Sequence, residues 1–139
     1  MAKKLVILGA GESGVGTALL AKQKGYDVFV SDASTIQPNF QKELELHQIE
    51  FEFGAHSVER ILAADEVMKS PGIPEKNELV VAIRAKGIPV ISEIEFGYRY
   101  KGNAKIAAIT GSNGKTTTTS LLFHICQVAE QDAAMVGNI

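Results

Sequence analysis

The sequence predicts an α/β protein, a parallel sheet with helices on both faces, followed by the first strand, loop and helix of a truncated second domain. Short apolar runs alternate with segments of helical pattern along the first 100 residues, an order that builds parallel sheets. The first run, at 5–8, leads directly into a glycine turn at 9–14, and a later run, at 106–109, leads into a second at 111–114. Each loop lies between a predicted strand and a helix, which predicts two phosphate-binding sites.

Composition restricts the class of protein. With 139 residues, 45% of them hydrophobic and 22% charged, the chain is long enough for one ordinary α/β domain and part of another. A net charge of −2 without a basic stripe argues against a nucleic-acid partner. No apolar run has the length of a signal peptide or a membrane span, so we expect a cytoplasmic protein without membrane insertion. The single Cys126 is interpreted as a core thiol, and His47, His56 and His124 as ordinary surface or core residues.

The glycine turn at 9–14 has the G-x-G-x-x-G spacing and follows a strand directly. A helix ending near Gly25 and a second strand at 27–31 complete a βαβ unit, the context of a Rossmann-like nucleotide site. Asp32 closes the second strand and would contact a ribose if the ligand were NAD(P), while Ser13 adds a hydroxyl at the mouth. The glycines alone do not choose between NAD(P) and a nucleotide-sugar.

The middle of the chain supplies the other elements of the first domain. We expect a helix over 38–47, an edge strand over 49–53, a short helix over 58–62 capped by Ser57, and a fourth strand over 66–69. The proline-rich loop 70–74 should lie at the carboxyl edge of the sheet, beside the glycine turn. A helix over 79–85, a fifth strand over 88–91 and a helix opened by the capping box of Ser92 and Glu95 follow. We place the domain boundaries at 1–93, with a helix and linker at 94–104, and 105–139.

The second glycine loop is followed by Lys115 and Thr116. In a phosphate loop the lysine would reach the β- and γ-phosphates of ATP, and the threonine hydroxyl would bind Mg²⁺. The spacing Gly-x-x-Gly-Lys-Thr is shorter than the general P-loop, which places a glycine where Ile109 stands. The alternative is an ordinary turn followed by a solvated lysine, but the strand before it and the helix after it favour a phosphate site.

Two such units in one chain, with TGSNGKTTT at 110–118, resemble the Mur ligases, the ATP-dependent amide-forming enzymes of peptidoglycan assembly. GAGESG at 9–14, SPGI at 70–73 and GNI at 137–139 are similar to the members that add D-glutamate to UDP-N-acetylmuramoyl-L-alanine. The resemblance implies a first domain that holds the UDP and a central domain that binds ATP and Mg²⁺. It also implies the reaction: ATP phosphorylates the substrate carboxylate, and the amine of D-glutamate attacks the acyl phosphate.

The resemblance assigns residues to both sites. The UDP-sugar would be bound by Gly9, Gly11, Glu12, Ser13, Gly14, Asp32, Ala33, Ser34, Ser70, Pro71, Gly72 and Asn138. ATP would be bound by Gly111, Ser112, Asn113, Gly114, Lys115, Thr116 and Thr117. Lys115 would be catalytic through its charge, and Thr116 would be the Mg²⁺ ligand.

We expect the chain to be an N-terminal fragment of such a ligase, inactive alone because the D-glutamate-binding domain is absent. An NAD(P)-dependent oxidoreductase is a weaker alternative, since a dehydrogenase has no use for the second loop. A non-catalytic nucleotide sensor and another Mur ligase also remain open, whereas a folylpolyglutamate synthetase is disfavoured because its P-loop domain comes first in the chain. The segment 104–139 carries ten large apolar side chains. It should therefore pack on the first domain or, through the open edge of the strand at 106–109, on the same segment of a second chain.

Overall fold

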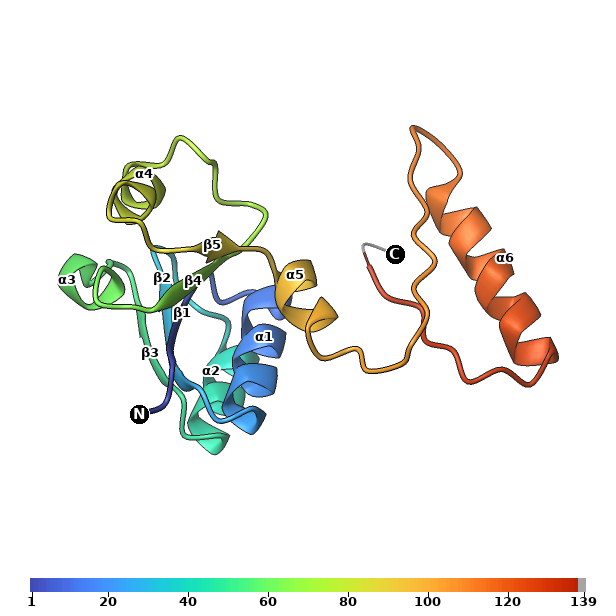
Figure 1. The fold of residues 1–139 in the computed structure, drawn as a ribbon, viewed down its shortest axis with the longest axis horizontal. Helices are drawn as coiled ribbons and strands as arrows, with labels where there is room; N and C mark the ends of the chain where they lie inside the picture. The colour runs from blue at the N-terminus through green and yellow to red at the C-terminus, as the bar shows by residue number, and fades with distance from the viewer. Residues whose placement is uncertain (138–139) are drawn as a thin grey trace. The chain divides into compact units, whose positions relative to one another are not determined.

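The computed structural model describes residues 1–137 and consists of two units, Met1–Gly102 and Asn103–Ile139, each described here by itself (Figure 1). The strands of the first unit are β1 (Lys4–Leu8), β2 (Asp27–Asp32), β3 (Glu50–Phe53), β4 (Glu66–Lys69) and β5 (Val90–Ile91). Its helices are α1 (Glu12–Gln23), α2 (Pro38–Leu46), α3 (Val58–Ile61), α4 (Glu78–Ala85) and α5 (Glu93–Tyr98). The second unit contains α6 (Lys115–Val128).

The five strands form one parallel sheet in the order β3-β2-β1-β4-β5. The chain builds outward from β1 to β3, then returns to the other side of β1 with β4. Ligands of open α/β sheets bind at this kind of switch point, outside the carboxyl ends of the strands. The topology thus directs attention to the ends of β1, β2 and β4.

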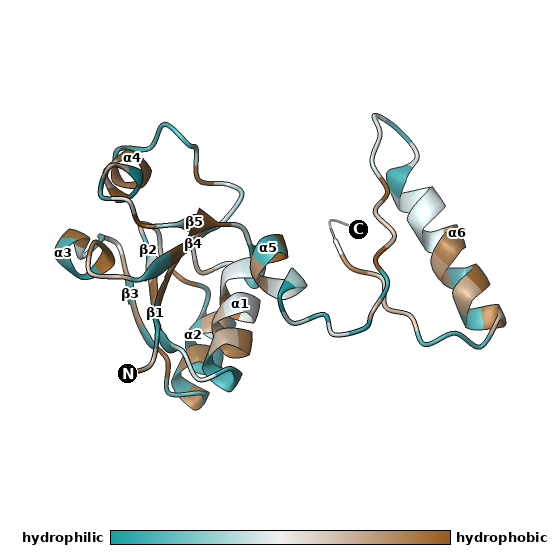
Figure 2. Ribbon diagram, viewed as in Figure 1, coloured by the Kyte–Doolittle hydropathy of each residue, from teal (hydrophilic) through white to brown (hydrophobic). Residues whose placement is uncertain are grey.

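The central strands are buried on both faces, as the continuous apolar run of β1 predicts for a parallel sheet. Alternate residues of β1 belong to two separate clusters. Leu5 and Ile7 pack with residues of α1, α2 and α5, whereas Val6 and Leu8 pack with residues of α3 and α4. Figure 2 shows the strands as a hydrophobic layer between helices of mixed character. The predicted parallel sheet with helices on both faces is therefore confirmed.

A buried carboxylate ties α5 to the sheet. Glu66, at the start of β4, is only 2% exposed. Arg99 donates hydrogen bonds of 2.9 and 2.7 Å to its two oxygens, and Lys3 donates a third of 3.1 Å. The Arg99 hydrogen bonds lower the pKa of Glu66, against the opposing effect of desolvation. A buried charge is tolerated when it is paired in this way.

Two predicted helix caps behave differently. Ser92 accepts a hydrogen bond from the backbone N–H of Glu95 at 3.1 Å, as a capping serine should, while the Glu95 carboxylate lies 3.5 Å from Arg99. Ser57 stands at the N-cap position of α3, but its side chain does not cap the helix. Its hydroxyl donates to Glu52 instead. The prediction of a capping Ser57 hydroxyl is wrong because a charged acceptor lies within reach.

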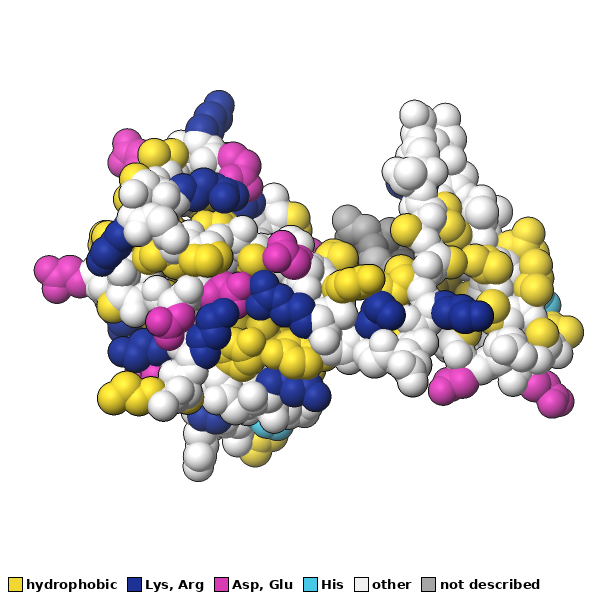
Figure 3. All heavy atoms as spheres, viewed as in Figure 1, with side chains coloured by type: hydrophobic (Ala, Val, Ile, Leu, Met, Phe, Trp, Pro, Cys, Tyr) yellow, Lys and Arg dark blue, Asp and Glu magenta, His cyan; other side chains and the backbone are white. Residues whose placement is uncertain are grey.

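The predicted strand at 106–109 is wrong: residues 105–110 form no strand. A strand needs a hydrogen-bonded neighbour, and the part of this unit that the structure describes provides none. No described side chain between 102 and 137 is buried, and even Cys126, which we expected in a core, is half-exposed. Exposed apolar residues include Ile106, Leu121 and Ile125, and Figure 3 shows hydrophobic side chains at the surface around α6. Within residues 1–137, no helix combines the length and apolar character that crossing a membrane requires.

Candidate functional site

Two glycines of the 9–14 turn are required by the fold itself. Gly9 has φ +95°, which L side chains rarely adopt, and a Cβ added there would lie 2.5 Å from the Ser70 hydroxyl oxygen. A Cβ added at Gly14 would lie 1.9 Å from the carbonyl oxygen of Gly9. These glycines allow β1, α1 and the loop after β4 to meet closely. The 70–74 loop therefore reaches the glycine turn, as its position after a parallel strand predicted.

Gly11 has a different environment. Its φ of −79° and ψ of −171° are ordinary for any residue, and a Cβ added there would meet nothing within 4 Å. Neither backbone conformation nor internal packing explains a glycine at this position. It stands at the N-cap of α1, which no side chain caps. Open space beside an uncapped helix N-terminus suits a diphosphate, whose oxygens approach backbone N–H groups closely.

Asp32 fastens this turn to the end of β2. Its Oδ2 accepts a hydrogen bond of 2.7 Å from the backbone N–H of Ala10, and its Oδ1 accepts one of 2.7 Å from that of Ser34. One carboxylate thus orders both the glycine turn and the loop after β2. This role differs from the ribose contact that an NAD(P) site would assign to the same residue.

A cavity of about 210 Å³ opens beside the turn. It is lined by the ends of β1 and β2 and by the loops that follow β3 and β4. Of the residues predicted to bind the UDP-sugar, the lining includes Gly9, Asp32, Ala33, Ser34 and Gly72. Leu8, Ile73 and Leu79 add apolar wall. The cavity therefore combines apolar and polar lining residues, at the sheet edge where ligands of such folds bind.

The remaining predicted residues of this site lie around the same edge. Glu12 and Ser13 are exposed in the first turn of α1, and Pro71 is exposed in the loop after β4. That loop is fastened by Lys69, whose ammonium donates to the carbonyl oxygen of Ile73 at 2.7 Å. Asn138 lies outside the described residues.

The second glycine loop leads directly into α6. Gly111 and Gly114 have φ of +151° and +74°, and α6 starts at Lys115 with no side-chain cap. The ammonium of Lys115 donates to the carbonyl oxygen of Gly111 at 2.6 Å, so the side chain folds back over the loop. Thr116 lies in the first turn, and the predicted ATP-binding residues of 111–117 are all exposed. Glycines with positive φ and an uncapped N-terminus fit a nucleotide phosphate with its Mg²⁺.

A protein-family model described as Mur ligase MurD-like, N-terminal domain, matches residues 3–92. The chain belongs to this Mur ligase family. The UDP-N-acetylmuramoylalanine–D-glutamate ligase of Bacteroides thetaiotaomicron is 56% identical over 137 residues, which cover 99% of this chain and 31% of that protein. The ligase of the same name from Cytophaga hutchinsonii is 57% identical over 140 residues, which cover 100% of this chain and 31% of that protein. The chain thus spans 31% of the length of these curated relatives, and the resemblance to the Mur ligases is confirmed.

Solved structures of Mur ligases share the fold. A murein peptide ligase from Psychrobacter arcticus superposes with a TM-score of 0.68 at 27% identity, covering 93% of this chain and 27% of that one. A pseudomurein peptide ligase type C from Methanothermus fervidus superposes with a TM-score of 0.64 at 30% identity. The match covers 91% of this chain and 26% of that one. The family and the fold therefore agree with the Rossmann-like parallel sheet of the first unit.

Sequence reasoning missed His56, which lines the cavity, and the two residues behind it, Ser31 and Glu52. Ser31 of β2 and Glu52 of β3 are paired in register, and the Ser31 hydroxyl donates to Glu52 Oε1 at 2.6 Å. His56, in the loop after β3, lines the cavity and places its Nδ1 2.7 Å from the Ser31 oxygen. The interpretation of His56 as an ordinary residue overlooked this cluster. Polar residues near the carboxyl ends of two neighbouring strands were the available signal.

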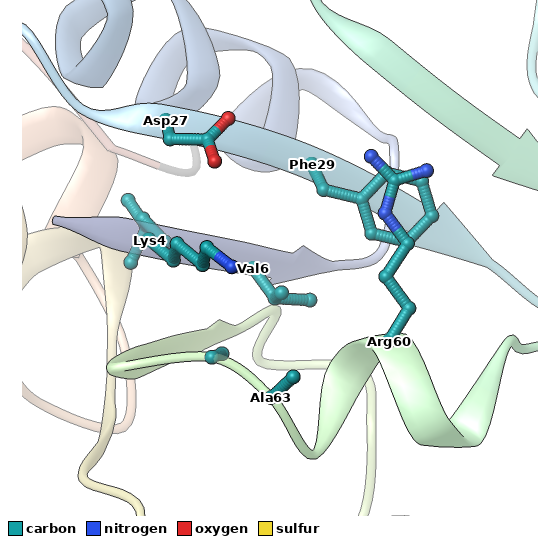
Figure 4. A pocket seen from close by; sticks show the side chains of 8 residues that line it. Lys4, Val6, Asp27, Phe29, Arg60 and Ala63 are labelled. Carbon is teal, nitrogen blue, oxygen red and sulfur yellow. The ribbon is translucent and has the colours of Figure 1, made fainter. Parts of the chain in front are cut away.

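A second cavity, of about 150 Å³, lies at the other end of the sheet (Figure 4). Lys4 and Asp27 contribute from the first residues of β1 and β2, and Arg60 from α3. The Arg60 guanidinium lies 3.7 Å from the centroid of the Phe29 ring and also pairs with Glu50. This arrangement packs α3 on the sheet, and none of the predicted site residues lines the cavity.

Proposed function

We propose that this chain is the N-terminal part of a ligase that adds D-glutamate to UDP-N-acetylmuramoyl-L-alanine in the cytoplasm. The names and identities of the curated relatives support this assignment. The observation that carries it is Gly11, a glycine that the fold does not need, facing open space at the N-terminus of α1. We expect that space to hold the diphosphate of the UDP-sugar.

In this proposal the UDP spans the turn and the cavity. The backbone of Glu12, Ser13 and Gly14 faces the diphosphate, where the dipole of the twelve-residue α1 favours negative charge. The nucleoside enters the cavity between the residues that follow β2 and those that follow β4. Apolar wall from Leu8 and Leu79 would cover the planar base.

The 111–117 loop would bind ATP in the same proposal. Lys115 would exchange the carbonyl oxygen of Gly111 for phosphate oxygens, and the Thr116 hydroxyl would hold Mg²⁺. ATP with Mg²⁺ supplies the phosphoryl group that activates the substrate carboxylate as an acyl phosphate, which the amine of D-glutamate then attacks. The contribution of this chain is charge: the Lys115 ammonium stabilises the negative charge that develops on the transferred group.

Calorimetric titration of residues 1–139 with UDP, UDP-N-acetylmuramoyl-L-alanine and NADH tests the proposal. We expect both uridine ligands to bind and NADH not to bind, because the curated relatives that support the assignment are named as ligases of a UDP-sugar. Tighter binding of NADH than of UDP would overturn the ligase assignment and favour an oxidoreductase.

A further inference from the structure

We infer that His56 determines which nucleoside the cavity accepts, through a hydrogen bond from the nucleoside to its Nε2 atom. Ser31 and Glu52 act as positioning residues that hold the imidazole in the tautomer able to accept that bond. The inference rests on the proposed function, since it concerns the nucleoside end of the same UDP site.

The chain of hydrogen bonds begins at Glu52. Burial raises the pKa of this carboxyl, but hydrogen bonds from Ser31 and Ser57 outweigh that effect and leave the pKa lowered. Its Oε1 accepts the Ser31 hydroxyl at 2.6 Å and the Ser57 backbone N–H at 2.7 Å. An ionised carboxylate only accepts hydrogen bonds, so the Ser31 proton must point toward Glu52.

The orientation of the Ser31 proton fixes the tautomer of His56. Because that proton is used, the Ser31 oxygen can only accept from His56 Nδ1, which lies 2.7 Å away. Nδ1 must therefore carry a proton, and Nε2 of the neutral ring is left as a bare acceptor. Ser31 is fully buried and Glu52 is its partner in the β2–β3 register, so the sheet itself holds this arrangement.

His56 places this acceptor on a residue of the cavity wall. His56 lines the cavity together with Asp32 and Ser34. Among the described residues, no hydrogen bond engages Nε2, whereas each oxygen of Asp32 already accepts one bond from a backbone N–H group. The imidazole nitrogen is thus an unoccupied side-chain acceptor, on a residue that lines the cavity, for a nucleoside donor.

Uridine offers two kinds of donor, the N3–H of the base and the hydroxyls of the ribose. CDP lacks the first, because the N3 of cytosine is itself an acceptor and would oppose the lone pair of Nε2. The deoxy analogues of UDP each lack one hydroxyl. Titrations with UDP, CDP, 2′-deoxy-UDP and 3′-deoxy-UDP therefore identify the donor that His56 recognises.

The experiment is calorimetry on residues 1–139 at about pH 8. We expect UDP to bind about tenfold more tightly than the analogue that lacks the recognised donor. His56→Asn keeps an amide N–H near the position of Nδ1 and removes Nε2. The affinity of this variant for UDP should therefore fall to the affinity that the wild-type chain has for that analogue. Ser31→Ala should reduce the same preference with His56 still present. Without the Ser31 oxygen, nothing holds the imidazole proton on Nδ1, so Nε2 can carry the proton instead of accepting a hydrogen bond.

Two further variants complete the test. His56→Gln can place a carbonyl oxygen near the position of Nε2 and should restore part of the preference, and His47→Asn, exposed after α2, should change nothing. If His56→Asn lowers the affinities for UDP and for all the analogues by the same factor, the residue only shapes the cavity and the inference is overturned. Wild-type chain that binds UDP without preference also overturns it but leaves the proposed function standing. Wild-type chain that does not bind UDP removes the proposed function, and the inference with it.

Discussion

Asp32 accepts a hydrogen bond from the backbone N–H of Ala10 at 2.7 Å, and this contact holds the glycine turn against the end of β2. The same side chain orders the loop that begins at Ala33, through Ser34. A residue at the position usually associated with a ribose contact thus has a structural role on two sides of the candidate site.

Asp32→Asn should both destabilise the fold and weaken UDP binding. The amide retains one acceptor oxygen, so one of the two backbone N–H groups loses its partner, at a cost of roughly 1–3 kcal/mol. Urea unfolding and calorimetry measure the two effects. Asp27→Asn, at the exposed start of β2, is the matched control and should alter neither. Unchanged stability in Asp32→Asn would contradict the structural role.

Replacements at three glycines should separate ligand space from packing. Gly11→Leu should abolish UDP binding and leave the melting temperature nearly unchanged, because its side chain would fill open space. Gly14→Ala should destabilise the fold, since its Cβ would lie 1.9 Å from the Gly9 carbonyl oxygen. Gly16→Ala, also in open space on α1, should preserve binding and stabilise the helix by about 0.5–1 kcal/mol. Full UDP affinity in Gly11→Leu would show that the diphosphate binds elsewhere.

Lys115→Ala in the complete ligase should reduce kcat by about 10²–10³, because a charge that stabilises the transferred phosphoryl group is lost. Affinity for the UDP-sugar, measured by calorimetry, should stay the same. Lys105→Ala, an exposed lysine of the same unit, should leave the rate unchanged. Equal losses of rate and UDP-sugar affinity in Lys115→Ala would mean that the two loops have been assigned wrongly. Residues 1–139 alone should show no turnover.

Glu66 should make the stability of the first unit depend on pH. Its pKa in the folded state is lowered, so the stabilisation is fully present above the pKa of an unfolded glutamate, about 4.3. It is lost as the pH falls through the lower, folded value. Glu66→Gln should be less stable than the wild type at neutral pH by roughly 1.5–3 kcal/mol. In urea unfolding, its free energy of unfolding should also fall less steeply than that of the wild type as the pH is lowered. Glu45→Gln, exposed on α2, should keep the wild-type profile, and an equally steep fall in Glu66→Gln would contradict the assignment.

Self-association through 104–139 remains a prediction. The exposed apolar side chains of this segment, such as Leu121 and Ile125, favour burial against another surface. Size-exclusion chromatography with light scattering should show residues 1–139 as a dimer or larger species and residues 1–102 as a monomer. Ile125→Asp should reduce the association. A strictly monomeric 1–139 whose 104–139 segment resists protease would instead indicate docking within one chain.

The sheet was predictable because its sequence signals are local. β1 is an apolar run that ends in a glycine-rich turn, β4 is a short strand that ends in a proline-rich loop, and the sequence of β3 alternates as that of an edge strand should. The run at 106–109 has the same apolar pattern and forms no strand. Its local signal is similar, but a strand also depends on a neighbour that local sequence does not contain.

The candidate site was predictable only in part for a related reason. The glycine turn and the 70–74 loop follow strands, and the rule for parallel sheets brings strand ends together. The Glu52–Ser31–His56 chain depends on the register of β2 with β3 and on the path of the loop after β3. No spacing motif records such a register, so these residues carried no signal comparable to that of the glycines.

The contact between Gly9 and Ser70 also bears on the order of folding. β1, α1 and β2 are consecutive and can assemble early, but Ser70 arrives only after the chain has passed from β3 beyond β2 and β1 and β4 has paired with the free side of β1. Such distant pairings form slowly because a long loop must close first. A partly folded chain with β1, β2 and β3 in place would have the glycine turn but only one wall of the cavity. A nucleotide that needs both walls therefore selects the finished sheet, and its binding free energy adds to the stability of the native state alone.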